Sequence, residues 1–139
     1  MAELPLTGSC LCGRVRFEVS EVPVSASYCH CTRCQKRTGT AASPEAGILP
    51  GSLRITSGED LLRIYEPPDG SADVFCSACG SGLGGVNPET NEIMSVRMSA
   101  FDEDPGVHPS YRQFVAYAAD WEPIPEDGLP RYPERKPRL

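Results

Sequence analysis

The 139-residue sequence is poor in histidine and tryptophan and has no long hydrophobic run. It contains two histidines, too few for a catalytic triad built on histidine to be expected. No segment approaches the roughly 18 apolar residues that a membrane-spanning helix requires. The first ten residues lack a charged start followed by an apolar stretch, so we predict no signal peptide and a cytoplasmic protein.

An excess of positive charge is also absent. Lys and Arg number 13 against 19 Asp and Glu, which gives a net charge of −6. Proteins that bind nucleic acid or acidic membranes need a basic face, so we expect neither partner. The length fits one domain, and we expect a monomer or a homodimer.

Short alternating segments are the main sign of secondary structure. In residues 13–19, Val15, Phe17 and Val19 alternate with charged residues, as in a strand with one buried face. Similar segments between Gly, Pro and Asp turns predict strands over 53–56, 62–65, 73–76, 93–98 and 111–117. Only residues 32–43 are expected to form a short helix. The predicted fold class is therefore all-β with little helix.

The C-terminal residues differ in composition from the rest of the chain. Residues 122–139 contain five prolines and few apolar side chains. We therefore predict a domain over 1–121 and an extension over 122–139 that either packs on it or is partly disordered. Trp121, just before the extension, is expected to be a packing anchor. The basic residues of the extension are expected to carry solvated charge: Arg131, Arg135, Lys136 and Arg138.

Seven cysteines stand in three groups along the chain. Their number is odd, so disulfides alone would leave one thiol over, and a reducing cytoplasm disfavours disulfides. Grouped cysteines are instead typical of metal sites, where several thiolates converge on one ion. The groups are Cys10 and Cys12; Cys29, Cys31 and Cys34; and Cys76 and Cys79.

The two cysteine pairs predict a structural zinc site. Cys10-Leu-Cys12 and Cys76-Ser-Ala-Cys79 are each followed by a glycine, which lets the backbone turn with a positive φ. Such turns present two sulfurs to one ion, and two of them complete a closed tetrahedral zinc site. The alternative is that these residues are buried free thiols, which behave as small hydrophobic side chains.

The triplet Cys29-His-Cys31-Thr-Arg-Cys34 offers three thiolates and has no obvious fourth ligand. Three protein ligands with an open position are typical of a reactive zinc, so we predict a second, labile zinc and a catalytic role for the three cysteines. His30 would point away from both flanking sulfurs in an extended segment and is not expected to be a ligand. The alternatives are an empty site, or a second structural zinc that takes its fourth ligand from elsewhere in the chain.

Three cations lie within or just after the triplet: Arg33, Lys36 and Arg37. Cations lower the pKa of nearby thiols and can hold the carboxylates of an anionic substrate. The alternative interpretation is ordinary surface charge. Glu45 and Asp102 are candidates for a general base, and His108 is expected to be exposed in a turn.

These motifs together resemble the glutathione-dependent formaldehyde-activating enzyme family, which includes the centromere protein V type. The resemblance rests on residues 8–17, 29–39 and 75–81 and places all seven cysteines at motif positions. It implies a β-tent of small antiparallel sheets with zinc knuckles. It also implies a structural zinc on the two cysteine pairs and a second zinc on the triplet, associated with glutathione and catalysis. The implied activity is condensation of formaldehyde with glutathione to S-hydroxymethylglutathione, a carbon–sulfur lyase reaction in reverse.

Three functions follow as hypotheses: an enzyme, a non-enzymatic scaffold, and a thiol carrier or detoxifier that acts on another electrophile. As an enzyme, the protein would hold a deprotonated thiol, glutathione, near formaldehyde or a similar small electrophile at the triplet zinc. Arg33, Lys36 and Arg37 would then bind the glutathione carboxylates. As a non-enzymatic scaffold with two zinc ions, the protein would bind another protein or carry a regulatory thiol.

Overall fold

The computed structural model describes residues 3–68 and 71–137, which form mainly short strands. The strands are β1 (Leu6–Ser9), β2 (Arg16–Val19), β3 (Ser25–Cys29), β4 (Ser43–Gly47), β5 (Leu53–Ser57), β6 (Leu62–Tyr65), β7 (Ala72–Cys76), β8 (Gly82–Val86), β9 (Ser95–Arg97) and β10 (Arg112–Gln113). The helices are α1 (Thr32–Thr38) and the 3-10 turns η1 (Glu59–Leu61), η2 (Met98–Ala100) and η3 (Val115–Tyr117). The predicted all-β class is confirmed.

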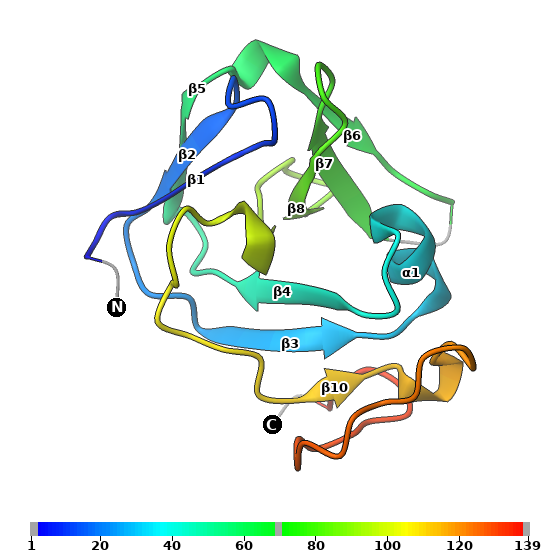
Figure 1. The fold of residues 1–139 in the computed structure, drawn as a ribbon. Coiled ribbons are helices and arrows are strands. Elements are labelled where there is room, and N and C mark those ends of the chain that lie inside the picture. Colours follow the sequence, from blue (N-terminus) through cyan, green and yellow to red (C-terminus); the bar gives the residue numbers. More distant parts are fainter. Residues whose placement is uncertain (1–2, 69–70, 138–139) are drawn as a thin grey trace.

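Three small sheets enclose the core. Their strand orders are β1-β2-β5, β10-β3-β4-β9 and β6-β7-β8. The paired strands are antiparallel, except that β10 runs parallel to β3. In Figure 1 the sheets stand as three sides of a triangle, and α1 lies at the corner where β3 and β4 approach the β6-β7-β8 sheet. This arrangement matches the tent of sheets that the family resemblance implies.

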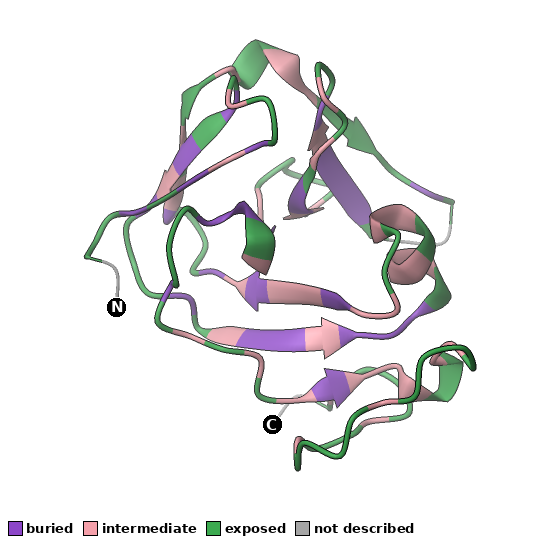
Figure 2. Cartoon of the chain, viewed as in Figure 1, coloured by how far each residue is buried: buried purple, intermediate pink, exposed green. Residues whose placement is uncertain are grey.

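The hydrophobic core lies between the sheets. Val15, Phe17 and Val19 are all buried, as the alternation in the sequence predicts. The ring of Phe17 packs edge-on against Phe101, with 6.1 Å between the ring centroids. Figure 2 shows buried residues on all three sheets around this interior. Burial of this apolar surface is the main force that holds the sheets together.

Four strands were not predicted from the sequence: β1, β3, β4 and β8. The segments 93–98 and 111–117 were predicted as longer strands than they are, since they contain only β9 and β10. The second of these predictions fails at Phe114, whose positive φ of 58° turns the backbone out of the strand. Strand β8 has the sequence Gly-Leu-Gly-Gly-Val, and glycine weakens any strand pattern in a sequence.

The helix α1 is shorter than the predicted range of 32–43. It ends at Gly39, which adopts the left-handed conformation with φ 70° and donates its amide to the carbonyl of Gln35 at 2.9 Å. Glycine is the residue that best tolerates this conformation at a helix end. The chain then turns directly into β4. This short helix determines the positions of Cys34 and of the basic residues that follow it.

Residues 122–137 run beside β10 rather than away from the sheets. The amide of Arg112 donates to the carbonyl of Pro130, and the amide of Tyr132 donates to the carbonyl of Arg112, both at 2.8 Å. The prediction for Trp121 is wrong, because its side chain is 70% exposed and anchors nothing in the core. Hydrogen bonds from the extension to β10 take the place of an aromatic anchor.

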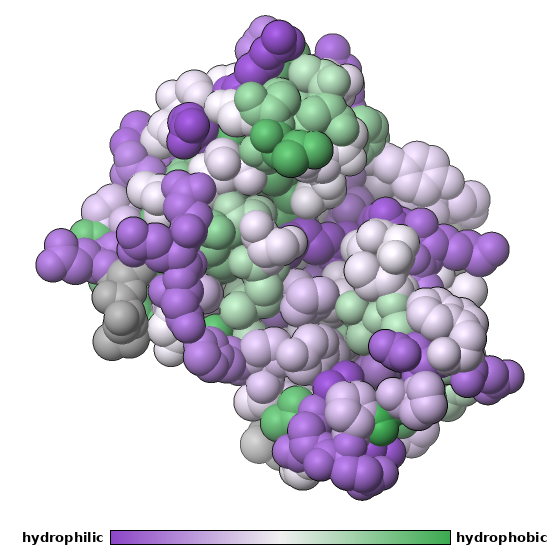
Figure 3. All heavy atoms as spheres, in the orientation of Figure 1, coloured by the Kyte–Doolittle hydropathy of each residue, from purple (hydrophilic) through white to green (hydrophobic). Residues whose placement is uncertain are grey.

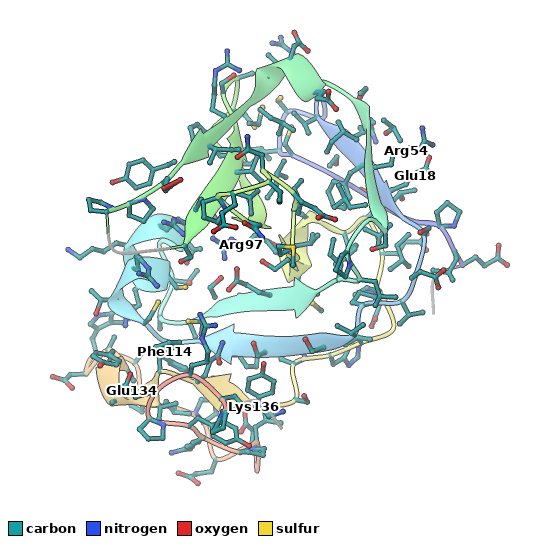
Figure 4. The ribbon with its side chains drawn as sticks, turned by 180° about the vertical axis from the view of Figure 1, so that it is seen from behind. Glu18, Arg54, Arg97, Phe114, Glu134 and Lys136 are labelled. Carbon is teal, nitrogen blue, oxygen red and sulfur yellow. The ribbon has the colours of Figure 1, made fainter. Side chains whose placement is uncertain are left out.

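The basic residues of the extension differ in their surroundings. Arg131 and Arg135 are exposed, as expected of solvated charge, and Arg131 forms a surface pair with Glu126 at 3.5 Å. Lys136 is partly buried, and its Nζ lies 4.9 Å from the centroid of the Tyr111 ring, which corrects the expectation for this residue. Figure 4 places Lys136 beside Phe114 and Glu134 at this edge of the molecule. Arg138, predicted with them, lies outside the described residues.

The helices of the described residues can be compared with the requirements of a membrane span. Among residues 3–68 and 71–137, no helix has the length and apolar character of a membrane span. On the face shown in Figure 3, hydrophobic residues are interrupted by hydrophilic ones.

We predict that Gly84→Ala destabilises the fold by about 1–3 kcal/mol, because a Cβ at this position overpacks the core. That atom would lie 1.8 Å from the carbonyl oxygen of Ser95, so β8 and β9 must separate. Gly82→Ala is the matched control, since its Cβ would meet its nearest atom at 3.7 Å. Thermal unfolding of both variants measures the difference. Equal melting temperatures for the two variants contradict the predicted packing.

Candidate functional site

The four cysteines of the two pairs converge at one place. Cys10 directly follows β1 and Cys76 is the last residue of β7, and each turn closes on a glycine with positive φ, Gly13 at 78° and Gly80 at 82°. The sulfurs of Cys10 and Cys12 are 3.5 Å apart, and those of Cys12 and Cys76 are 3.9 Å apart. All four sulfurs, including that of Cys79, lie within 4.8 Å of one another. Zinc–sulfur bonds of about 2.3 Å in a tetrahedron set sulfurs about 3.8 Å apart, so the donor set fits zinc.

Hydrogen bonds connect the two turns around this cluster. The Leu11 amide donates to Ser81 Oγ at 2.9 Å, and the same hydroxyl lies 3.3 Å from the sulfur of Cys79. The Ser81 hydroxyl, together with backbone amides of Ser81 and Cys12, lowers the pKa of Cys79 to about 5. The Val15 amide donates to the sulfur of Cys10 at 3.4 Å. These donors favour thiolates, which are the form that binds a metal.

The triplet forms a second cluster at the start of α1. Cys29 ends β3, Cys31 is the N-cap residue of α1, and Cys34 lies in the helix. Their sulfurs lie within 4.8 Å of one another, and the Cys34 amide donates to the sulfur of Cys31 at 3.2 Å. Among the described residues, no further His, Cys, Asp or Glu ligand atom belongs to this group. The described chain therefore brings three ligands together here against four in the other cluster.

The three thiols of the triplet differ in acidity. Hydrogen bonds from the Cys29 and Cys34 thiols lower the pKa of Cys31 to about 2, with a further contribution from the nearby charge of Arg33. In turn, the Cys31 sulfur raises the pKa of Cys29 to about 11. The pKa of Cys34 is raised by Cys29 and Cys31 and by burial. A second and third thiolate therefore require a compensating cation, and this suits a metal ion.

The three predicted cations occupy different surroundings on α1. The charge of Arg33 acts on Cys31, as the sequence analysis anticipates. Lys36 is exposed. Arg37 is mostly buried, and its Nη1 lies 3.7 Å from the carboxylate of Asp73 on β7.

His30 packs away from the sulfurs. It is buried, and its Nε2 lies 3.2 Å from Nη1 of Arg112 on β10. Burial lowers the pKa of the ring, and the neighbouring charge of Arg112 adds to the effect. This agrees with the expectation that His30 is not a ligand. His108 is exposed, as expected, and its Nε2 lies 2.6 Å from Asp104.

A buried arginine beside the triplet was missed by sequence reasoning. Arg97 on β9 donates to Ser43 Oγ at 2.9 Å, to Asp73 Oδ2 at 3.0 Å and to the carboxylate of Glu45. Figure 4 shows its side chain inside the molecule, between β4 and the β6-β7-β8 sheet. Burial raises the pKa of Glu45, while Arg97 lowers it. Glu45 is thus an ion-pair partner of Arg97, close enough to affect Cys31 and Cys34 electrostatically.

The other candidate base lies elsewhere in the fold. Asp102 accepts a hydrogen bond from Thr7 Oγ1 at 2.7 Å on the exposed side of β1. Figure 1 shows β1 and α1 on opposite sides of the molecule. The position of Asp102 therefore gives no support to a role as base at the triplet.

The fold and the two sulfur clusters define a β protein built around cysteine metal sites. The sequence model of the family described as "Glutathione-dependent formaldehyde-activating enzyme" matches residues 5–117, and the chain belongs to this family. A Halomonas elongata protein named "Putative glutathione-dependent formaldehyde-activating enzyme" is 34% identical over 105 residues, which cover 71% of this chain and 67% of the relative.

A solved structure is similar in fold. The crystal structure of a Rhodobacter sphaeroides protein superposes with a TM-score of 0.55 at 22% identity. The match covers 91% of this chain and 98% of the other. This likeness supports the arrangement of sheets and nothing more specific.

Proposed function

We propose that the protein condenses glutathione with formaldehyde to S-hydroxymethylglutathione at the Cys29-Cys31-Cys34 cluster. The supporting observation is that three sulfurs converge there without a fourth ligand among the described residues, in a chain of this family. In the reaction the thiol adds across the carbonyl: a carbon–sulfur bond forms, the π bond breaks, and the thiol proton ends on the oxygen. In reverse this is a carbon–sulfur lyase reaction.

Cys10, Cys12, Cys76 and Cys79 would hold a structural zinc, and the triplet would hold a second one. Bound at the triplet, zinc would supply a positive charge that favours the thiolate form of a neighbouring sulfur near neutral pH. The protein itself would hold the thiol substrate close to the small aldehyde. This positioning makes a bimolecular step effectively unimolecular.

Basic residues of α1 orient the substrate in this proposal. Arg33, Lys36 and Arg37 follow the triplet on one short helix and would bind the carboxylates of glutathione. Arg33 already acts electrostatically on Cys31. The reaction would take place in the cytoplasm, where it would remove formaldehyde. None of the seven cysteines is joined in a disulfide, and a reducing compartment favours this state.

The test is the rate of S-hydroxymethylglutathione formation, followed by NMR exchange between free and adduct formaldehyde in zinc-loaded protein. We expect an increase above the buffer rate, and a loss of at least about tenfold in Cys34→Ser, because even residues that only support a metal ligand cost this much when mutated. Thr32→Ala, an exposed change on the same helix, should keep the rate.

The control measurement is thermal unfolding, which should show that Cys34→Ser stays folded. A wild-type rate equal to that of the buffer contradicts the proposal. That result would favour the alternative of a non-enzymatic scaffold with two zinc ions.

A further inference from the structure

A polar pocket lies between α1 and the turn that carries Cys79. Its volume is about 340 Å³. Hydroxyl groups and guanidinium groups line it, and no carboxylate stands among its described lining residues. The side chains that could donate to a ligand are Arg37, Ser81, Arg97 and Ser99. Such a wall favours a ligand that accepts hydrogen bonds, above all an anion.

One buried donor at this pocket has no partner. Arg97 is 5% exposed, and its Nε finds no hydrogen-bond acceptor among the described residues. A Cβ added at Gly82, which also lines the pocket, would lie 3.9 Å from this Nε and 3.7 Å from Asp73 Oδ2, the carboxylate oxygen that Arg97 already binds. The unpaired N–H is thus next to the pocket wall formed by Gly82. Buried polar groups are almost always paired, so an acceptor from outside the chain is expected here.

The other nitrogens of Arg97 are already engaged. They donate to Ser43, Glu45 and Asp73, and these three residues fix the plane of the guanidinium. A second guanidinium, that of Arg37, is held by the other oxygen of the Asp73 carboxylate. Asp73 thus holds both arginines beside the pocket, and a ligand that accepts a hydrogen bond from the buried Arg97 Nε must displace part of the wall at Gly82.

The pocket adjoins the sulfur triplet. Arg37 lies three residues after Cys34 in α1, so the two side chains leave the same face of the helix. Thr38, another lining residue, donates its hydroxyl to the Cys34 carbonyl at 2.7 Å. The pocket wall and Cys34 are thus connected through α1.

We propose that this pocket binds a carboxylate of the thiol substrate, with Arg97 Nε and Arg37 as its principal donors. The inference rests on the proposed function, because it takes the thiol substrate to react at the triplet. The pocket then makes the enzyme select peptide thiols that carry a carboxylate over neutral thiols of similar size. Arg97 becomes a specificity-determining residue that touches the substrate.

The test uses S-methylglutathione, which keeps both carboxylates but has no free thiol. Calorimetric titration into zinc-loaded protein should show binding. Gly82→Val should weaken it by at least about tenfold, since the side chain would cover the Arg97 Nε and remove a charged hydrogen bond. Arg37→Gln should weaken it as well. The matched control is Arg54→Gln, which changes an exposed arginine paired with Glu18 on another sheet (Figure 4) and should leave the affinity unchanged.

A second ligand tests whether the free carboxylates of glutathione are what the pocket binds. Glutathione diethyl ester keeps the thiol and lacks free carboxylates, so its affinity should be lower than that of glutathione and should not fall further in Gly82→Val. Thermal unfolding should show that Gly82→Val stays folded, and Gly82→Ala, whose Cβ makes only ordinary contacts, is the matched variant without the larger side chain.

Two results would overturn the inference: no binding of S-methylglutathione at millimolar concentration, or equal affinity in wild type, Gly82→Val and Arg37→Gln. These failures are separate from failure of the proposed function. One combined outcome distinguishes them: the protein fails to accelerate adduct formation, while Gly82→Val still lowers the affinity for S-methylglutathione. That result would support the carboxylate pocket and contradict the catalytic proposal.

Discussion

Cys76→Ser is expected to abolish the cooperative unfolding transition of the protein. Cys76 is fully buried and supplies one of four sulfurs that join the turn after β1 to the turn after β7. A structural zinc contributes about 10–16 kcal/mol to folding in small zinc-finger peptides. The whole stability of a small domain is about 5–15 kcal/mol. Loss of this ion would therefore remove most or all of the free energy that favours the native state.

Cys34→Ser is the matched comparison, since it makes the same chemical change in the other cluster. We expect zinc content of about two per chain in the wild type and about one in a folded Cys34→Ser, measured by metal analysis after gel filtration. Circular dichroism with thermal scanning of both variants gives the second measurement. If Cys76→Ser melts like the wild type, the four-sulfur cluster does not hold the fold. If both variants unfold alike, the division into a structural and a reactive cluster is wrong.

The grouping of the cysteines could be predicted from the sequence because it depends on local geometry. A glycine after each pair fixes a tight turn, and a tight turn sets two sulfurs close together whatever the rest of the fold does. The same applies to Cys31 and Cys34, which lie within one turn of helix. The fold class also follows from local patterns, as in the alternation of Val15, Phe17 and Val19.

The ion pairs of Arg97 could not be predicted in this way. Its partners lie on strands of two different sheets, and no spacing in the sequence indicates that Ser43, Glu45 and Asp73 meet around one guanidinium. A useful signal was present nonetheless. Arg97 stands between Val96 and Met98 in a segment predicted to be a strand, and a charged residue among apolar ones often has a buried partner.

The glycine-rich strand β8 illustrates a second limit. Its glycines indicate a turn when the sequence is considered alone. In the structure Gly84 is required, because the backbone of β9 approaches it too closely for any side chain. This requirement arises from contact between strands distant in sequence. The extended C-terminal residues are similar, because their order depends on hydrogen bonds to β10 rather than on their own composition.

Arg97→Met should be the most destabilising change outside the cysteines. It leaves the carboxylates of Asp73 and Glu45 near each other without their shared cation, and removal of one partner from a buried ion pair costs about 3–5 kcal/mol. Arg54→Met is the control, because its pair with Glu18 is exposed and such pairs contribute about 0–1 kcal/mol. Chemical denaturation at constant zinc content measures both free energies of unfolding.

The effect of Arg97→Met should also depend on pH, in a direction set by the two carboxyl groups. Burial raises the pKa of both Asp73 and Glu45, and Arg97 opposes this in each case. A carboxyl with a raised pKa binds more protons in the folded state, so its contribution to stability falls as pH rises through that pKa. Without Arg97 both values rise further, and the variant should lose most stability at alkaline pH and regain part of it on acidification.

The measurement is the difference in unfolding free energy between wild type and Arg97→Met at about pH 8 and about pH 5.5, with zinc retention verified at each. We expect a smaller difference at the lower pH. Adding Asp73→Asn to Arg97→Met should recover part of the loss at the higher pH, because it removes the repulsion between the Asp73 and Glu45 carboxylates. Of these two carboxylates, only that of Asp73 still pairs with Arg37, at 3.7 Å. A difference that is the same at both pH values, with no recovery in the double variant, would mean that Arg97 acts through packing rather than through its charge.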